Sequence, residues 1–219
     1  MIIKNVFFDL DGTLIDSSKD IVSALQKAYQ VVCNQYIEID FRYIGPPVQE
    51  IIDILTPNLD MEIKLKIVES FRLLYDNGIH NQTIMYEGCE DVLNSLINKN
   101  IKLFIVTNKP IHPTRKILSI FEIDWLFIDI ATPDFISERK MNKSEMIEYL
   151  ILKHQLVSEE TIMIGDTASD IIAAKNNSIM SVGICGGYGD LEELKKSKPD
   201  RLINKFYEIK DLNFNYMGV

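Results

Sequence analysis

The chain has 219 residues, 47% hydrophobic and 25% charged, a balance typical of a globular protein with one core, or one core carrying an insertion. Its 23 basic and 32 acidic side chains give a net charge of −9, which excludes duplex nucleic acid as an expected partner. Charged residues interrupt every apolar run well before the ~20 residues of a membrane span, so we expect no membrane partner. The N-terminus lacks a secretion-signal pattern and the three cysteines lie far apart, which favours the cytoplasm and reduced thiols.

Short apolar runs predict the strands of a sheet. Runs of this kind suit strands that are buried on both faces, as in a parallel sheet. The segments between most of them are long enough for a helix, and alternating strands and helices predict an α/β fold with a doubly wound sheet. The predicted strands cover residues 2–10, 102–106, 125–131, 161–164 and 179–183.

About ninety residues separate the first two predicted strands, far more than one crossover helix needs. Within this stretch Ile21, Leu25 and Ala28 recur at helical spacing, and a second helical pattern lies around residues 63–74. We therefore predict a helical insertion over residues 16–84, in a core formed by residues 1–15 and 85–219.

Two carboxylates lie at the end of the first predicted strand. In extended chain the side chains of Asp9 and Asp11 project to the same side, and the carboxyl ends of parallel strands are where ligands bind in an open α/β sheet. Carboxylates that close together need a cation, a shared proton or strong hydrogen bonds. The alternative is a plain turn, in which Gly12 ends the strand and Thr13 caps the next segment.

Two further strand ends carry polar groups. Thr107 and Asn108 offer a hydroxyl and an amide that could grip an oxyanion, although they could equally cap the next helix. Asp166 and Asp170 follow the strand at 161–164, the second of them one turn into a helix, where an acidic side chain is favoured in any case. Together the three strand ends could hold Mg²⁺ beside a phosphate group.

The order of these motifs resembles the haloacid dehalogenase (HAD) superfamily, and within it the phosphoglycolate phosphatase and 5′-nucleotidase-like branch. The segment 9–13 is similar to its first motif, Thr107-Asn108 to its second and the segment 165–170 to its fourth. The resemblance spans the whole chain. It implies a Rossmann-like core whose small helical cap is inserted after the first strand.

The resemblance also implies a mechanism through an aspartyl phosphate. Asp9 would be the nucleophile, and Asp11 would protonate the leaving alkoxide and then take a proton from water. Asp9 and Asp166 would coordinate Mg²⁺, with the backbone carbonyl of Asp11 as a further ligand. Asp170 would be either another ligand or an acceptor that orients the site.

The family needs a lysine to neutralise the nucleophile and the phosphate, and this sequence departs from the common lysine-proline pattern. We assign that role to Lys143, which directly precedes an amphipathic helix, with Lys140 as the alternative. Either could also be a solvated surface lysine. Thr107 and Asn108 would hold the phosphoryl oxygens together with the lysine.

We therefore predict a Mg²⁺-dependent phosphatase for a small phosphorylated metabolite: phosphoglycolate, a sugar phosphate or a nucleoside 5′-monophosphate. By analogy Arg42, Tyr43 and Gly45 of the insertion would select the substrate, although Arg42 could simply form a surface salt bridge. The alternatives are a phosphomutase similar to β-phosphoglucomutase, and a non-catalytic protein that binds phospho-ligands or acts in signalling. We expect a monomer or a homodimer.

Overall fold

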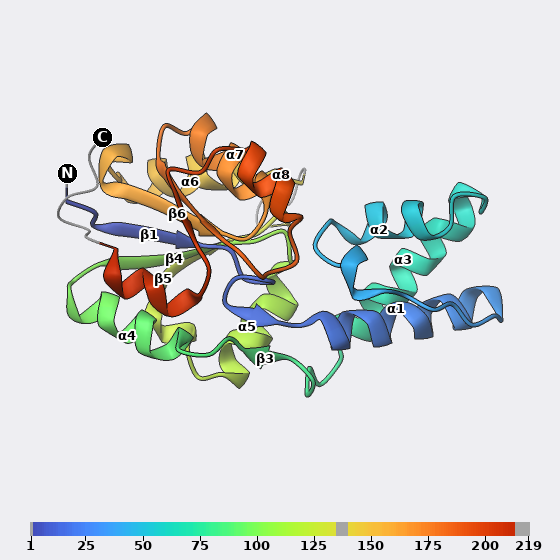
Figure 1. The fold of residues 1–219 in the computed structure, drawn as a ribbon. Coiled ribbons are helices and arrows are strands. Elements are labelled where there is room, and N and C mark those ends of the chain that lie inside the picture. Colours follow the sequence, from blue (N-terminus) through green and yellow to red (C-terminus); the bar gives the residue numbers. More distant parts are fainter. Residues whose placement is uncertain (1, 135–139, 213–219) are drawn as a thin grey trace. The chain divides into compact units, whose positions relative to one another are not determined.

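The computed structural model describes residues 2–134 and 140–212. Their contacts divide the chain into two compact units, Met1–Ile15 with Met85–Val219, and Asp16–Ile84. The first unit contains a large sheet and the second consists mainly of helices (Figure 1).

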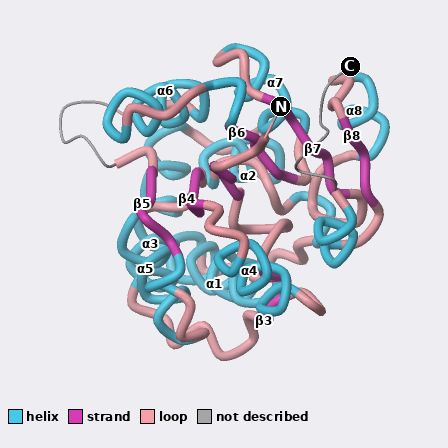
Figure 2. Tube along the Cα trace, turned by 90° about the vertical axis from the view of Figure 1, so that its left-hand side faces the viewer, coloured by secondary structure: helices cyan, strands magenta, loops and turns pink. Residues whose placement is uncertain are grey.

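The larger unit is built on a six-stranded sheet in which every neighbouring pair is parallel. Its order is β5-β4-β1-β6-β7-β8. Figure 2 labels β5, β4, β6, β7 and β8 in this order from left to right. The first strand, β1, is buried at all four positions, as expected of a central parallel strand with helices on both faces. The strands are β1 (Asn5–Phe8), β4 (Lys102–Val106), β5 (Phe127–Ala131), β6 (Thr161–Gly165), β7 (Met180–Ile184) and β8 (Arg201–Ile203).

Neighbouring residues of a strand point to opposite faces, so Phe7 and Phe8 enter two different hydrophobic clusters. Phe8 packs in the cluster that α4 and α5 cover, and Phe7 in the cluster that α6 and α7 cover. Figure 1 shows these helix pairs on opposite sides of the sheet. This arrangement confirms the predicted doubly wound α/β fold. The helices are α4 (Cys89–Asn98), α5 (Ile111–Ile120), α6 (Lys143–His154), α7 (Ala168–Asn176) and α8 (Leu191–Lys196).

The smaller unit contains three α-helices and one short 3-10 segment in its described residues. Helices α1 and α3 pack together through apolar positions at helical spacing, among them Leu25 and Ala28 of α1 and Ile67 of α3. The chain passes between the units through β2 (Ile15–Asp16) and β3 (Ile84–Met85), which pair as a two-stranded sheet. The remaining elements are α1 (Ser18–Cys33), η1 (Phe41–Tyr43), α2 (Val48–Leu55) and α3 (Met61–Asp76).

The strand predictions differ from the structure by more than one residue in three places. The predicted strand at 2–10 is shorter as β1, which covers only Asn5–Phe8. Residues 125 and 126 belong to a 3-10 turn, η2 (Asp124–Leu126), and β5 starts only at Phe127, because Trp125 is exposed instead of pointing into the core. The apolar runs also give no indication of β8, a three-residue edge strand with two exposed side chains. Among the described helices, none combines the length and the apolar character that a bilayer span requires.

Candidate active site

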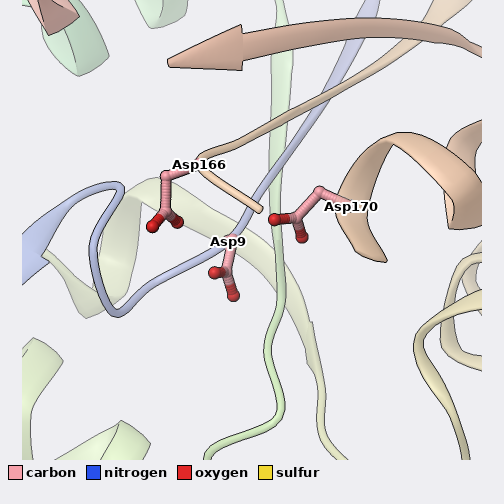
Figure 3. A group of neighbouring side chains, drawn as sticks. All are labelled: Asp9, Asp166 and Asp170. Atoms are coloured by element: carbon pink, nitrogen blue, oxygen red, sulfur yellow. The ribbon is translucent and has the colours of Figure 1, made fainter. Parts of the chain in front are cut away.

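Three carboxylates converge at the carboxyl ends of two neighbouring strands. Asp9 follows β1 and Asp166 follows β6, and the parallel register of these strands brings the two residues to the same edge of the sheet. Asp170, the third residue of α7, reaches the same place. One oxygen from each carboxylate lies within 4.8 Å of the others, and Figure 3 shows the three groups turned toward a common centre. All three side chains are buried.

Asp170 is held by its own helix and by a lysine. Its Oδ2 accepts hydrogen bonds from the backbone N of Thr167 at 3.0 Å and from its hydroxyl at 2.6 Å, the pattern of a capping box at the start of α7. Its Oδ1 lies 2.5 Å from Nζ of Lys143. The same Nζ lies 3.0 Å from Oδ1 of Asp9, so one ammonium bridges two of the three carboxylates.

Lys143 owes its position to the start of α6. It is the first residue of that helix, and Asn142 and Glu145 form a reciprocal capping box around it. Its side chain is 6% exposed. Lys140, the alternative, is exposed and precedes the helix. Of the two lysines, the structure brings Lys143 to the carboxylates.

The pKa values of this cluster reflect a conflict between burial and charge. Burial raises the pKa of Asp9 well above its ordinary range, against the opposing effect of Lys143. Burial also raises the pKa of Asp166 to about 6, and the charge of Asp170 adds to this. Burial opposes the charged form of Lys143, but Asp170 and Asp9 hold its pKa above the usual range. The three carboxylates therefore carry more negative charge than the single positive charge of Lys143 can neutralise.

Asp166 accepts hydrogen bonds from a residue of the segment 9–13 and from the loop after β7. Its Oδ1 accepts a hydrogen bond from the hydroxyl of Thr13 at 2.9 Å, so Thr13 is a partner of the site and not a helix cap. Its Oδ2 accepts from the backbone N of Tyr188 at 2.7 Å and of Gly189 at 3.1 Å. The loop after β7 thus contributes through its backbone, a contribution that side-chain types do not reveal.

The residues present fit a divalent cation with oxygen ligands. Three buried carboxylates form the kind of donor set that Mg²⁺ prefers, and the pKa values of two of them, Asp9 and Asp166, are raised. Glycines surround the carboxylates so closely that no side chain would fit in their place: a Cβ on Gly12 or Gly187 would collide with Asp166, and one on Gly165 with Asp170. Gly12 also has a φ of +84°, a conformation that favours glycine.

The second strand end lies beside this cluster. Thr107 follows β4 and is buried, and Asn108 is half-buried. The hydroxyl of Thr107 accepts from the backbone N of Lys109 at 3.2 Å. The first amide of α5, from Ile111, donates instead to Asp134 at 3.0 Å. Asp134, and not the Thr107-Asn108 pair, therefore serves the start of this helix.

Asp11 has a partner that lies outside the predicted site residues. Its Oδ2 lies 2.9 Å from Nζ of Lys109, which comes directly after Thr107 and Asn108. Lys109 is buried. A lysine beside a polar motif is a common surface feature, so its burial and pairing could be found only in three dimensions.

The predicted specificity residues belong to the smaller unit. Arg42 and Tyr43 lie in η1, and Gly45 comes two residues later with a φ of +132°. Tyr43 is half-buried, whereas the side chain of Arg42 lies outside the described residues. Their role in choosing a substrate stays a prediction.

We expect the stability of the metal-free protein to depend on pH through this cluster. A carboxyl group whose pKa is higher in the folded than in the unfolded state binds more protons in the folded state. The free energy of unfolding therefore falls as the pH rises from the unfolded-state pKa to the folded-state pKa. For Asp166 that interval runs from its ordinary 3.8 to about 6, and Asp9 acts in the same direction. Mg²⁺ binds the ionised groups, so it should raise the melting temperature more at about pH 7.5 than at about pH 5.

Thermal unfolding in EDTA and in Mg²⁺ at both pH values checks this expectation. An Asp166→Asn variant should lose most of the Mg²⁺ effect, whereas Asp124→Asn, which changes an exposed carboxylate of the same unit, should keep it. An equal Mg²⁺ effect at both pH values would contradict the expectation.

Comparison with known proteins defines the class of this fold and site. The family model described as haloacid dehalogenase-like hydrolase matches residues 6–184. The chain belongs to this family, which confirms the resemblance seen in its motifs.

Particular relatives are similar over nearly their whole length. A phosphoglycolate phosphatase from Photobacterium profundum is 31% identical, with 96% of this chain and 95% of the relative covered. The pyrophosphatase PpaX from Anoxybacillus flavithermus is 30% identical, with 95% and 96% covered. Among solved structures, a predicted phosphatase from Clostridium acetobutylicum aligns with a TM-score of 0.86 at 27% identity, covering 99% of this chain and 100% of that one.

Proposed function

We propose that this HAD-family phosphatase is a Mg²⁺-dependent hydrolase of small phosphomonoesters that works through an aspartyl phosphate on Asp9. The observation that carries the proposal is the buried carboxylate cluster with Lys143 bound to it, at 3.0 Å from Asp9. Phosphoglycolate is the first substrate to test, because a relative that carries this name covers 96% of the chain. Sugar phosphates and nucleoside 5′-monophosphates come next.

Asp9, Asp166 and Asp170 would hold the Mg²⁺ ion, with the backbone carbonyl of Asp11 as a further ligand. When bound, Mg²⁺ supplies positive charge that lets a phosphate dianion approach a carboxylate and polarises a phosphoryl oxygen.

In the first half-reaction an oxygen of Asp9 attacks phosphorus and the ester P–O bond breaks. Asp11 gives its proton to the departing oxygen, so an alcohol leaves and Asp9 carries the phosphoryl group. In the second, Asp11 takes a proton from a water molecule that attacks the same phosphorus. The bond between phosphorus and Asp9 breaks, which regenerates the Asp9 carboxylate and releases inorganic phosphate.

The surrounding side chains hold the phosphoryl group. Lys143 would bind a phosphoryl oxygen while it neutralises Asp9, and its place at the fixed start of α6 keeps it from moving away. Thr107 and Asn108 would donate hydrogen bonds to the other oxygens. Because these groups are already in place, little reorganisation is needed as charge moves.

The segment 16–84 would act as a cap that selects the substrate, with Arg42, Tyr43 and Gly45 as its contact residues. We further propose a cytoplasmic location, because Cys33, Cys89 and Cys185 are all free thiols, and a monomer or homodimer as the active form. A small phosphorylated metabolite would be the partner.

The test is phosphate release from a panel of phosphoglycolate, sugar phosphates, nucleoside monophosphates and inorganic pyrophosphate, with Mg²⁺ or with EDTA. We expect Mg²⁺-dependent release, with one small monoester preferred by kcat/KM. Inorganic pyrophosphate as the best substrate would favour the activity named for the PpaX relative. Transfer of the phosphoryl group to a second sugar hydroxyl, without phosphate release, would favour the phosphomutase alternative. No turnover by the folded protein would leave the non-catalytic alternative.

A further inference from the structure

Lys109 is a buried lysine with no role in the steps above. Its side chain is 4% exposed, and its Nζ lies 2.9 Å from Oδ2 of Asp11. Taking an ammonium group out of water costs several kcal/mol unless an opposite charge compensates it. A lysine of this kind on an ordinary surface loop would extend into solvent instead. Its burial therefore calls for an explanation at the site itself.

The backbone of Lys109 is fixed on both sides. Its N–H donates to the hydroxyl of Thr107 at 3.2 Å, and its carbonyl accepts from the hydroxyl of Thr114 at 3.4 Å. Both threonines are buried, and Pro110 comes after Lys109 as the last residue before α5. The ammonium therefore extends from an anchored point at the end of β4, and its position is well determined.

Asp11 is the carboxylate of the site that most needs to be held. Its side chain is 18% exposed, against 7% for Asp9 and 0% for Asp170. A partly exposed side chain keeps several rotamers, and ordering it costs entropy. Lys143 is engaged by Asp9 and Asp170, so Lys109 and Lys143 serve different carboxylates.

We propose that Lys109 is a positioning residue for Asp11, an inference that rests on the proposed function. The ion pair holds Oδ2 and so limits rotation of the whole carboxyl group. This keeps the group where the leaving oxygen and the attacking water must meet it. Lys109 forms no bond to substrate and transfers no proton in this scheme. Misplacing a catalytic group by about 1 Å can cost roughly 100-fold in rate, so the contribution is measurable.

The experiment exploits the leaving group. An alkyl phosphate such as phosphoglycolate needs a proton on its departing oxygen, whereas p-nitrophenyl phosphate releases a stable anion without one. We expect Lys109→Met to lower kcat for phosphoglycolate by about 10- to 100-fold, with KM changed by less than about threefold. In a stopped-flow measurement, the rate of the first burst of p-nitrophenol should stay within about threefold of the wild type. Asp11→Asn should give the same pattern with a larger loss.

A double-variant cycle separates positioning from an independent effect. If Lys109 acts through Asp11, the combined Asp11→Asn and Lys109→Met variant should be no more than about twofold slower than Asp11→Asn alone. Lys109→Arg, which restores the cation, should recover part of the rate. Lys109→Gln gives a second neutral variant should the methionine variant fold poorly, which thermal unfolding shows. Lys102→Met, an exposed lysine at the opposite end of β4, is the matched control.

Three results would overturn the proposal: equal losses in phosphoglycolate turnover and in the p-nitrophenol burst, a loss confined to KM, or fully additive effects in the double variant. Normal turnover by Lys109→Met beside an active wild type would also reject it, while leaving the proposed function intact. A wild type that releases phosphate from no monoester would reject both.

Discussion

Asp9→Asn is expected to abolish turnover of every phosphomonoester, with kcat lowered by about 10⁴-fold or more. Asparagine has nearly the shape of aspartate, but its neutral amide cannot form the acyl phosphate on which both half-reactions depend. The wild type, quenched in acid during turnover of a labelled substrate, should carry a phosphoryl group that hydroxylamine removes. The variant should carry none.

The folded state should survive this substitution. Burial already raises the pKa of Asp9 well above its ordinary range, so a neutral side chain at this position removes a desolvation cost while Lys143 keeps its contact with Asp170. We expect a melting temperature within a few degrees of the wild type, and normal turnover by the control Asp124→Asn. Labelled protein or residual Mg²⁺-dependent turnover in Asp9→Asn would show that another residue is the nucleophile.

Lys143→Met should affect both activity and stability. It removes the ammonium that bridges Asp9 and Asp170 and leaves buried carboxylates without that charge, a change that typically costs about 3–5 kcal/mol in the free energy of unfolding. Loss of one preorganised donor to the phosphoryl group should lower kcat by about 10²- to 10³-fold. Urea unfolding in EDTA and steady-state kinetics in Mg²⁺ measure the two effects.

Three comparisons sharpen this prediction. Mg²⁺ should recover more stability in Lys143→Met than in the wild type, because the ion replaces part of the lost positive charge. Lys143→Arg should retain stability better than activity, since a guanidinium keeps the charge but not the geometry. Lys140→Met tests the competing assignment: a larger loss of activity there than in Lys143→Met would reverse the roles of the two lysines.

Much of the fold could be predicted because its central strands are short, apolar and buried on both faces. For β4 the apolar run and the strand share the bounds Lys102–Val106, since every residue after the first is buried. The same pattern is missing from β8, whose residues Arg201 and Leu202 are exposed. The same pattern places the start of β5 too early, at Trp125, because a large apolar side chain predicts a buried position even where it is exposed.

The residues of the site also fall into a group that the sequence predicts and a group that it does not. Asp9, Asp166 and Asp170 directly follow a strand or occupy the first turn of a helix, so the topology of a parallel sheet suffices to bring them together. The partners of Asp11 and Asp166 depend instead on contacts across the fold: Lys109 pairs with Asp11, and the loop at 188–189 donates backbone N–H groups to Asp166. Neither contact can be deduced from spacing or periodicity.

The paired strands β2 and β3 have a consequence for how such an enzyme can change. The two ends of the segment 16–84 are hydrogen-bonded neighbours, so the segment forms a closed loop on the larger unit. The free-energy cost of closing such a loop grows only slowly with its length. A shorter, longer or differently folded segment could be exchanged at the same junction without moving Asp9 or Asp166. Under the proposal that the segment 16–84 selects the substrate, substrate range and bond-breaking chemistry can evolve separately, because one continuous stretch of sequence encodes the selecting segment.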